Sequence, residues 1–301
     1  MNTATAFGAA PAMLAPRIIA EHATEGADSI TDVLERIDQW PSEHAAAAAI
    51  VGERTFTHGD AERIFALASV TKPLVAYAVM IAVEEGALEL DDAVGPGGAR
   101  VEQLLAHLGG VGFGSRELEK QPGQRRIYSS AGFEILAETI ENATGFSFPD
   151  YFDEAVCKPL NMRSTTLTGS AGHGAQASLN DLVSFAREVI HPTLIHPSTR
   201  DAMLSIVDAD AIGVVPGYGM YRPCPWGLGF EIKGTKNPHW TGTSMPAHTA
   251  GHFGQAGTFL WVDVPGDRAG IALTDKPFGP WAKPLWAPFN DALYQAMKKP
   301  L

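Results

Sequence analysis

A run of apolar residues that begins with a serine and a lysine is the feature that most constrains this chain of 301 residues. Residues 69–73 read Ser-Val-Thr-Lys-Pro and lead into an apolar stretch that continues to Val83. Because apolar side chains would cover every side of a helix with this sequence, we expect the helix to pass through the middle of a domain. Pro73 is tolerated only in a first turn, so the helix should begin near Ser69, and Gly86 should end it.

The spacing of Ser69 and Lys72 points to chemistry. Residues three apart on a helix share one face, about one turn from each other. An amine beside a hydroxyl is one way to make a weak nucleophile reactive at neutral pH. The pair alone is a weak signal, because serine and lysine take this spacing by chance in many chains. At the buried start of a central helix, however, both residues need a reason to be there, and we take Ser69 as a candidate nucleophile.

Composition excludes several classes of function. The formal net charge of −12 argues against nucleic acid and anionic membranes as partners, since both attract clusters of lysine and arginine. Cys157 and Cys224 are far apart and form no CxxC pair, so we expect two unpaired thiols, with a single disulfide as the alternative. His248 and His252 have a metal-like spacing, but the glycines around them argue against a helix, and no HExxH is present. We expect neither metal nor cofactor.

The first 16 residues contain no basic segment followed by a continuous apolar segment, so no secretory signal is recognised. No apolar stretch reaches the roughly 20 residues needed to span a bilayer. We therefore expect a soluble protein of the cytoplasm.

Strand patterns near both ends enclose a helical middle. The pattern predicts helix up to about Trp40, a strand at 46–51, strands at 257–264 and 269–274 joined by a turn, and a closing helix at 286–297. Between them, apolar stripes predict helices around 101–108, 133–140 (from Ser129-Ser130 to Gly145) and 182–190, the last capped by Ser178 or Asn180. The chain is thus expected to form an α+β domain from residues 1–86 and 206–301, interrupted by a helical domain at 87–205.

Two further segments could complete a reaction centre. Tyr128 lies in an expected loop just before a helix, where its hydroxyl can reach into a cleft, although an arbitrary tyrosine more often packs its ring and leaves its hydroxyl at the surface. The segment 251–258 is rich in glycine and begins an expected strand. Glycines there allow close backbone approach, and free N–H groups of an edge strand can bind a developing negative charge.

In this order, the three segments resemble the serine β-lactamase and penicillin-binding-protein superfamily, and most closely its class C β-lactamase, esterase and D-aminopeptidase branch. Ser69 and Lys72 match the Ser-x-x-Lys motif, and Tyr128 matches Tyr-x-Asn with Ser130 in place of asparagine. His252-Phe253-Gly254 matches the third motif, which is Lys-Thr-Gly in the lactamases and His-x-Gly in many esterases. Further similarities occur at 85–92, 104–107, 122–123, 158–162 and 226–230.

The resemblance implies an antiparallel sheet flanked by helices, an inserted helical domain, and an active site between them. It also implies that Ser69 is the nucleophile, that Lys72 activates it and that Tyr128 carries protons to and from the leaving group. Either Lys72 or Tyr128 could be the base during acylation. The backbone N–H groups of Ser69 and Gln255 would form the oxyanion hole, and His252 and Gly254 would line the wall of the cleft.

Departures from the motifs bear on the substrate. His252 replaces a fixed cation and is only partly charged near neutral pH, so an anionic acid should be held weakly. Ser130 offers one hydroxyl where asparagine offers an amide pair, and Phe253 makes the region apolar. We therefore expect a serine hydrolase acting on small neutral esters. The alternatives are a D-amino-acid peptidase, amidase or weak β-lactamase, and a binding module of the same fold without turnover.

Overall fold

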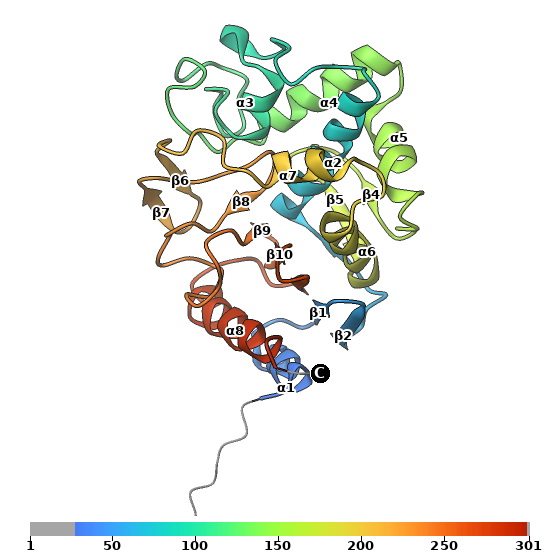
Figure 1. Ribbon diagram of the computed structural model, residues 1–301, viewed down its shortest axis with the longest axis vertical. Helices are drawn as coiled ribbons and strands as arrows, with labels where there is room; N and C mark the ends of the chain where they lie inside the picture. The colour runs from blue at the N-terminus through green and yellow to red at the C-terminus, as the bar shows by residue number, and fades with distance from the viewer. Residues whose placement is uncertain (1–27, 300–301) are drawn as a thin grey trace, which may run out of the picture.

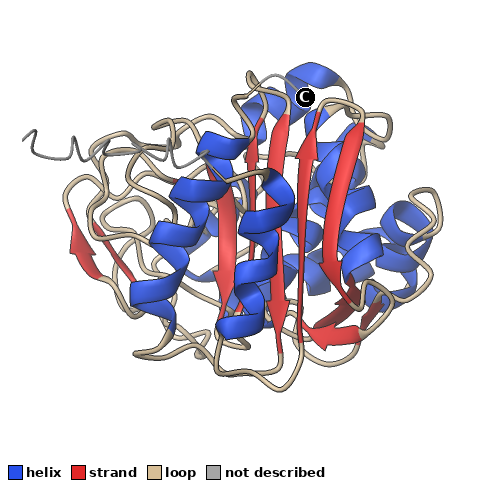
Figure 2. Ribbon diagram, turned by 90° about the horizontal axis from the view of Figure 1, so that it is seen from below, coloured by secondary structure: helices blue, strands red, loops and turns tan. Residues whose placement is uncertain are grey.

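The computed structural model describes residues 28–299 and is built on a six-stranded antiparallel sheet with helices on both faces (Figures 1 and 2). The strand order is β2-β1-β11-β10-β9-β8, so strands from the two ends of the chain pair side by side. The strands are β1 (Ala45–Val51), β2 (Arg54–Gly59), β8 (Glu231–Ile232), β9 (Ala250–Gly254), β10 (Thr258–Asp263) and β11 (Arg268–Thr274). The three strands expected from the sequence, β1, β10 and β11, are confirmed, and so is the α+β fold class.

Both faces of the sheet are buried, because side chains alternate between two apolar layers. Ala47 and Trp261 pack with helices α1 (Ile30–Leu34) and α8 (Ala282–Ala296). Figure 2 views the sheet from this side, with these helices in front of the strands. Their neighbours Ala48 and Leu260 pack in the opposite layer. The alanines of β1 are small enough for both layers to pack closely onto the strand.

The N-terminal helix is short and is capped. The Ser29 hydroxyl oxygen accepts a hydrogen bond from the Asp32 N–H, and the Asp32 carboxylate accepts one from the Ser29 N–H, which forms a capping box. A 3₁₀ turn, Glu35–Gln39, continues α1 to Trp40, where the sequence predicted the helix to end. The part of that prediction before residue 28 lies outside the described residues, as does the expected N-terminal tail.

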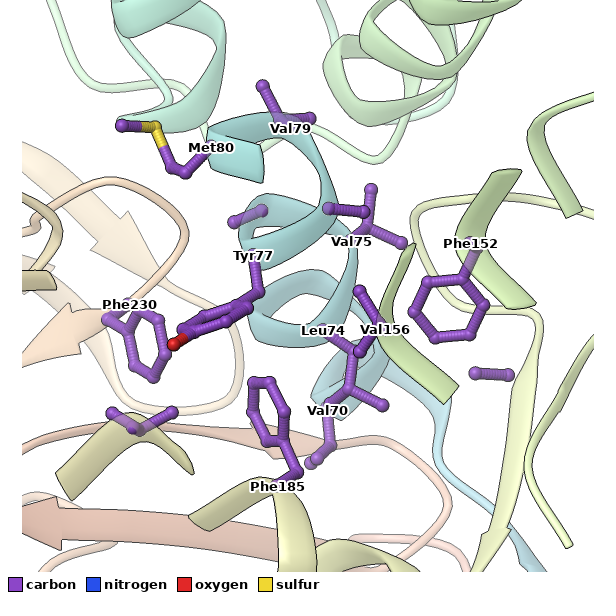
Figure 3. Packing of buried hydrophobic residues seen from close by; sticks show 14 of the residues in the cluster. Val70, Leu74, Val75, Tyr77, Val79, Met80, Phe152, Val156, Phe185 and Phe230 are labelled. Atoms are coloured by element: carbon purple, nitrogen blue, oxygen red, sulfur yellow. The ribbon is translucent and has the colours of Figure 1, made fainter. Parts of the chain in front are cut away.

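The opposite layer contains the central helix α2 (Thr71–Glu84), preceded by a 3₁₀ turn (Ala68–Val70). Every residue of α2 from Thr71 to Ala82 is buried, as expected for a helix with apolar side chains all round. Figure 3 shows Tyr77 of α2 directed between Phe185 and Phe230. Its hydroxyl donates to Glu188 at 2.7 Å. The start near Ser69 and the end before Gly86 are confirmed.

Helices surround the far side of α2 (Figure 1). Helix α4 (Ala131–Thr144) begins after Ser130 and ends at Gly145, as predicted, and Gly145 has the left-handed conformation. Ser178, one of the two caps that the sequence offered, caps α6 (Leu179–Ile190) by accepting from the Asp181 N–H. The remaining elements are α3 (Val101–Leu105), α5 (Phe148–Phe152), a π turn (Asp153–Cys157), α7 (Pro197–Met203) and a 3₁₀ turn (Pro96–Gly98).

Two small sheets were not predicted. One has the order β3 (Ile64–Ala66), β5 (Ala175–Ser178) and β4 (Thr166–Leu167), and the other is the hairpin of β6 (Gly213–Val215) and β7 (Gly219–Tyr221). Helix α6, within the expected helical domain, contacts β1, β10 and β11 of the main sheet. The division into 1–86 with 206–301 and 87–205 stays a prediction.

The structure also bears on the two cysteines and on membrane-spanning helices. Cys157 and Cys224 are both buried and unpaired. Among residues 28–299, no helix has both the length and the apolar character needed to cross a membrane.

Candidate active site

Ser69 lies in the 3₁₀ turn that leads into α2, directly beside β9. The residue before it, Ala68, has φ +46°, a left-handed conformation that is rare for alanine and is held by its surroundings. A Cβ atom on Gly254 of β9 would lie 2.2 Å from the carbonyl oxygen of Leu67. Glycine at 254 is therefore required for the strand to approach the turn this closely, and Thr258 fixes the approach by donating to the Leu67 carbonyl at 2.8 Å.

Lys72 is fully buried behind Ser69, and its Nζ atom has three neutral acceptors. It lies 3.3 Å from Ser69 Oγ, 3.1 Å from Ser130 Oγ and 2.8 Å from the Gly172 carbonyl oxygen. Burial without a contacting carboxylate lowers the pKa of Lys72 to about 7, and the charge of Glu134 partly opposes this shift. A large fraction of the side chain is thus unprotonated at neutral pH.

Tyr128 and His252 meet across the site. The Tyr128 hydroxyl lies 3.4 Å from His252 Nε2. His252 Nδ1 lies 2.7 Å from the Phe253 carbonyl oxygen, which can only accept, so Nδ1 carries the hydrogen and Nε2 accepts from Tyr128. Burial, helped by the charge of Lys72, lowers the pKa of His252 to about 3, so the imidazole is neutral.

The Tyr128 ring is held between aromatic groups and the lysine. Lys72 Nζ lies 4.5 Å from the ring centroid, and the rings of His107 and Phe113 pack against it. Burial raises the pKa of Tyr128 far above its ordinary value, although hydrogen bonding with Ser69 acts in the opposite direction, so the phenol keeps its proton. His107 Nδ1 accepts a hydrogen bond from the Ser129 N–H at 3.1 Å, which gives this histidine a structural role next to Tyr128.

A cavity of about 150 Å³ opens next to Ser69 and is mostly apolar. Strand β8 has two residues and pairs with β9 only at Ala250 and Gly251, so the edge of β9 from His252 onward is left free to form one wall. The sequence placed this segment at the start of β10, whereas it forms β9 and the turn into β10. The lining consists of Ser69, Phe113, Tyr128, Val215, Pro216, Trp226, Glu231, His252, Phe253 and Gln255.

One charged residue of this lining, Glu231, has its partners within the protein. Lys236 Nζ and His239 Nε2 both lie 3.0 Å from Glu231 Oε1, and the Trp240 indole N–H donates to Oε2 at 2.7 Å. All four groups are buried. Although burial opposes it, the charge of Lys236 holds the pKa of Glu231 well below its ordinary value, so the carboxylate is ionised.

The predicted residues lie together. Ser69, Tyr128, His252, Phe253 and Gln255 border the cavity, Lys72 and Ser130 lie behind Ser69, and Gly254 lies under its turn. Sequence reasoning missed the carbonyl of Gly172 and the lining residues Phe113, Val215, Pro216 and Glu231. A partial signal existed for Glu231, since it directly follows the 226–230 segment that resembles the family, but no sequence pattern marked the others.

The chain is similar to known proteins over most of its length. The Beta-lactamase family model matches residues 44–294. A solved β-lactamase from Mycobacterium bovis has 45% sequence identity and a TM-score of 0.87, covering 89% of this chain and 100% of that one. A structure titled EstCE1, a hydrolase with promiscuous acyltransferase activity, has 17% identity and a TM-score of 0.72, covering 88% of this chain and 97% of that chain, and it shows likeness of fold alone.

Curated relatives match over shorter stretches. A putative D-alanyl-D-alanine carboxypeptidase of Escherichia coli O157:H7 is 25% identical over 212 residues, which is 56% of this chain and 49% of the relative. The chain spans about half or less of the length of the curated relatives that it matches. Because the family model extends over most of the sequence, the chain belongs to the Beta-lactamase family of serine hydrolases.

Proposed function

We propose that this protein is a carboxylesterase that forms an acyl-enzyme on Ser69 with small, neutral esters. The observation that carries the proposal is the mostly apolar cavity beside a serine whose neighbouring lysine has a pKa of about 7. Lysine and arginine are both missing from the described residues that line this cavity. With His252 neutral and Glu231 ionised nearby, a substrate carboxylate would find no fixed positive partner and would meet a negative charge.

The protonation states of Lys72 and Tyr128 determine which group acts in each step of acylation. Ser69 Oγ attacks the ester carbonyl carbon while its proton passes to the unprotonated amine of Lys72. The bond from the acyl carbon to the leaving oxygen then breaks, and that oxygen takes a proton from the Tyr128 hydroxyl, which is restored from the Lys72 ammonium. Water reverses the sequence and releases the acid. Lys72 is proposed as the base, because its pKa lies near 7 whereas the Tyr128 phenol stays protonated.

The oxyanion would be bound where β9 contacts the 3₁₀ turn Ala68–Val70, which contains Ser69 and is here called the nucleophile turn. Ser69 and Gln255 border the same cavity from the two sides of that contact, and we assign their backbone N–H groups to the developing negative charge. Gly254 supports this assignment, since a side chain there would force β9 and the turn apart.

Cavity size limits the acyl group. An engineered protein cavity of roughly 150 Å³ accommodates benzene, so acetyl to butyryl groups fit a space of this size and long acyl chains do not. A second groove of about 440 Å³ shares Phe113, Tyr128 and Pro216 with the cavity. Since Tyr128 is the proposed proton donor to the leaving group, we assign the alcohol part of the ester to this groove.

The proposal is tested with p-nitrophenyl acetate, butyrate and decanoate. We expect turnover of the two short esters, little of the decanoate, and a loss of at least about 10³-fold in Ser69→Ala. A fluorophosphonate probe should label Ser69 in the wild type and leave Ser69→Ala unlabelled. Residual activity of Ser69→Ala within tenfold of wild type would refute the proposal.

A second candidate is supported by the relatives named D-alanyl-D-alanine carboxypeptidases. A D-amino-acid peptidase, amidase or weak β-lactamase would use the same Ser69 chemistry on an amide. Hydrolysis of D-Ala-p-nitroanilide or nitrocefin faster than of the short esters would favour it. A wild type that neither turns over any of these compounds nor reacts with the probe would instead be a binding module.

The proposed partner is a small-molecule ester, without nucleic acid or membrane, in keeping with the net charge of −12. A cytoplasmic location is proposed on the ground of two unpaired, buried thiols. Fractionation of cells that express the protein, followed by probe labelling of each fraction, tests the location.

A further inference from the structure

A chain of hydrogen bonds runs from Lys72 to a carboxylate that no family motif includes. The Gly172 carbonyl oxygen accepts from Lys72 Nζ at 2.8 Å. The Gly172 N–H donates to Ser170 Oγ at 3.1 Å, and the Ser170 hydroxyl donates in turn to Glu134 Oε1. Glu134 lies on α4, one turn after Ser130, and is partly exposed in a surface groove of about 460 Å³. The buried amine is thereby linked to a negative charge at the surface.

The loop that makes this link, residues 169–174, is fixed in place. A Cβ atom on Gly172 would lie 2.6 Å from Ser130 Cβ and 2.8 Å from Ser130 Cα, so the loop backbone packs directly on the second motif. The N–H of Gly174 donates to the Ser170 carbonyl at 2.7 Å and closes the turn. The Gly172 carbonyl therefore cannot move away from Lys72 without disturbing both Ser130 and Ser170.

Other groups around Lys72 do not supply this negative charge. Tyr128 and the two nearby histidines, His107 and His252, are neutral, because burial raises the pKa of the phenol and lowers those of the imidazoles. Glu231 is ionised but is bonded to Lys236. The groups that contact Lys72 or interact with it electrostatically are Ser69 from the 3₁₀ turn before α2, Tyr128 and Ser130 before α4, Glu134 on α4, His107 after α3, Gly172 from the loop and His252 on β9.

We propose that Glu134 is a positioning residue for the reaction, and that its carboxylate, bonded to the loop by Ser170, sets the pH at which Lys72 can accept the proton of Ser69. The inference rests on the proposed use of Lys72 as the base. Burial favours the neutral amine and the Glu134 charge favours the ammonium, so the two oppose each other. A general base is most effective when its pKa lies near the working pH. The opposing effects of burial and of the Glu134 charge keep the pKa of Lys72 in that range.

The test is the pH dependence of kcat/KM for p-nitrophenyl acetate in Glu134→Gln. Removing the charge should lower the pKa of Lys72. The part of the pH profile in which kcat/KM falls with acid, here called the acid limb, should then move to lower pH by about half a unit. At pH 6, kcat/KM divided by its value at high pH should be about threefold larger than in the wild type. Glu134→Asp keeps the charge and should keep the wild-type limb. Glu138→Gln is the matched control, since Glu138 lies one turn further along α4, paired with Arg116 at the surface, and should not move the limb.

The same pH series is measured for the rate of fluorophosphonate labelling of Ser69, which requires Lys72 but no ester turnover. An unmoved limb in Glu134→Gln, or an equal shift in Glu134→Asp or Glu138→Gln, would overturn the inference. If no ester is hydrolysed but the labelling limb moves as described, the proposed substrate fails and the role of Glu134 stands. Thermal unfolding of each variant separates a shifted limb from a damaged fold.

Discussion

The side chains of Lys72 and Lys236 are both fully buried, and their partners make them different chemical groups. Lys236 lies 3.0 Å from the carboxylate of Glu231 and also donates to the Pro225 carbonyl at 3.0 Å. Lys72 contacts two hydroxyls and one carbonyl, and the carboxylate that affects its pKa, Glu134, is linked to it only through the loop at 170–172.

Burial alone therefore does not decide whether a lysine is structural or reactive. A contacting carboxylate favours the ammonium form and makes the pair part of the framework, whereas neutral acceptors leave the amine free to lose its proton. Lys236 completes a network with His239 and Trp240 at the edge of the cavity. Lys72 lies against the nucleophile, where an amine that changes protonation is useful.

The largest effect should come from Lys72→Met. Removing the proposed base should lower kcat/KM for p-nitrophenyl acetate by about 10³-fold. The free energy of unfolding should stay the same or rise, because a buried amine is replaced by an apolar side chain of similar length. Kinetics and urea unfolding of the same preparation check both parts. A variant that unfolds more easily than wild type would show that Lys72 is part of the framework after all.

Lys236→Met should show the opposite behaviour. The substitution leaves Glu231 buried without its ammonium partner, at a cost of about 3–5 kcal/mol in unfolding free energy. Molecules that remain folded, counted by fluorophosphonate labelling, should keep kcat within a few-fold of wild type. The matched double variant Lys236→Met with Glu231→Gln should recover part of the stability. Loss of turnover in fully folded Lys236→Met would erase the distinction between the two lysines.

The pH dependence of the wild type should reflect Lys72. Because burial lowers the pKa of Lys72 to about 7, the amine is protonated and inactive as a base below that pH. On this basis kcat/KM should fall about tenfold for each unit of pH below 7 and level off above it. Stopped-flow rates between pH 5 and 9 measure this limb. A flat profile across this range would show that Lys72 does not titrate as the base.

The smallest effect is expected from His252→Lys, which places a further buried lysine beside Tyr128. The carboxylate of Glu231 acts on this position and is already paired with Lys236. A carboxylate on the acyl part of a substrate would be the partner that holds the new amine in its ammonium form, so kcat/KM for such a substrate, relative to a neutral one, should rise by about three- to tenfold. The comparison uses p-nitrophenyl esters of succinic and butyric acids. An unchanged ratio would mean that the neutral third motif does not set charge preference.

Local sequence patterns were enough to predict the central helix α2 and the Ser69–Lys72 pair at its start. The apolar sequence of α2, Pro73 in its first turn and the three-residue spacing of Ser69 and Lys72 all depend on neighbours along the chain, so the sequence specifies them. Strands β10 and β11 followed from two short, largely apolar runs and the Pro-Gly-Asp turn between them. The meeting of Tyr128 with His252 was expected only through family resemblance, because no local rule links residues 124 positions apart.

Other features depend on tertiary contacts and left no pattern. Strand β8 has two residues, too few for any periodicity. The contact of Gly172 with Lys72 arises from a loop 100 residues away, and glycine there resembles an ordinary turn glycine until Ser130 is placed beside it. The lining residue Val215 comes from a short hairpin whose sequence shows no clear alternation.

The short length of β8 affects how the substrate preference of this protein can change through insertions and deletions. Because β8 stops at Ile232 and pairs with only the first two residues of β9, the mouth of the cavity is set by the length of a peripheral strand. Insertions or deletions there would widen, narrow or roof over the entrance, while Ser69, Lys72 and Tyr128 keep their places on other elements. Substrate preference can therefore change through the length of β8 alone, while the groups that transfer protons stay in place.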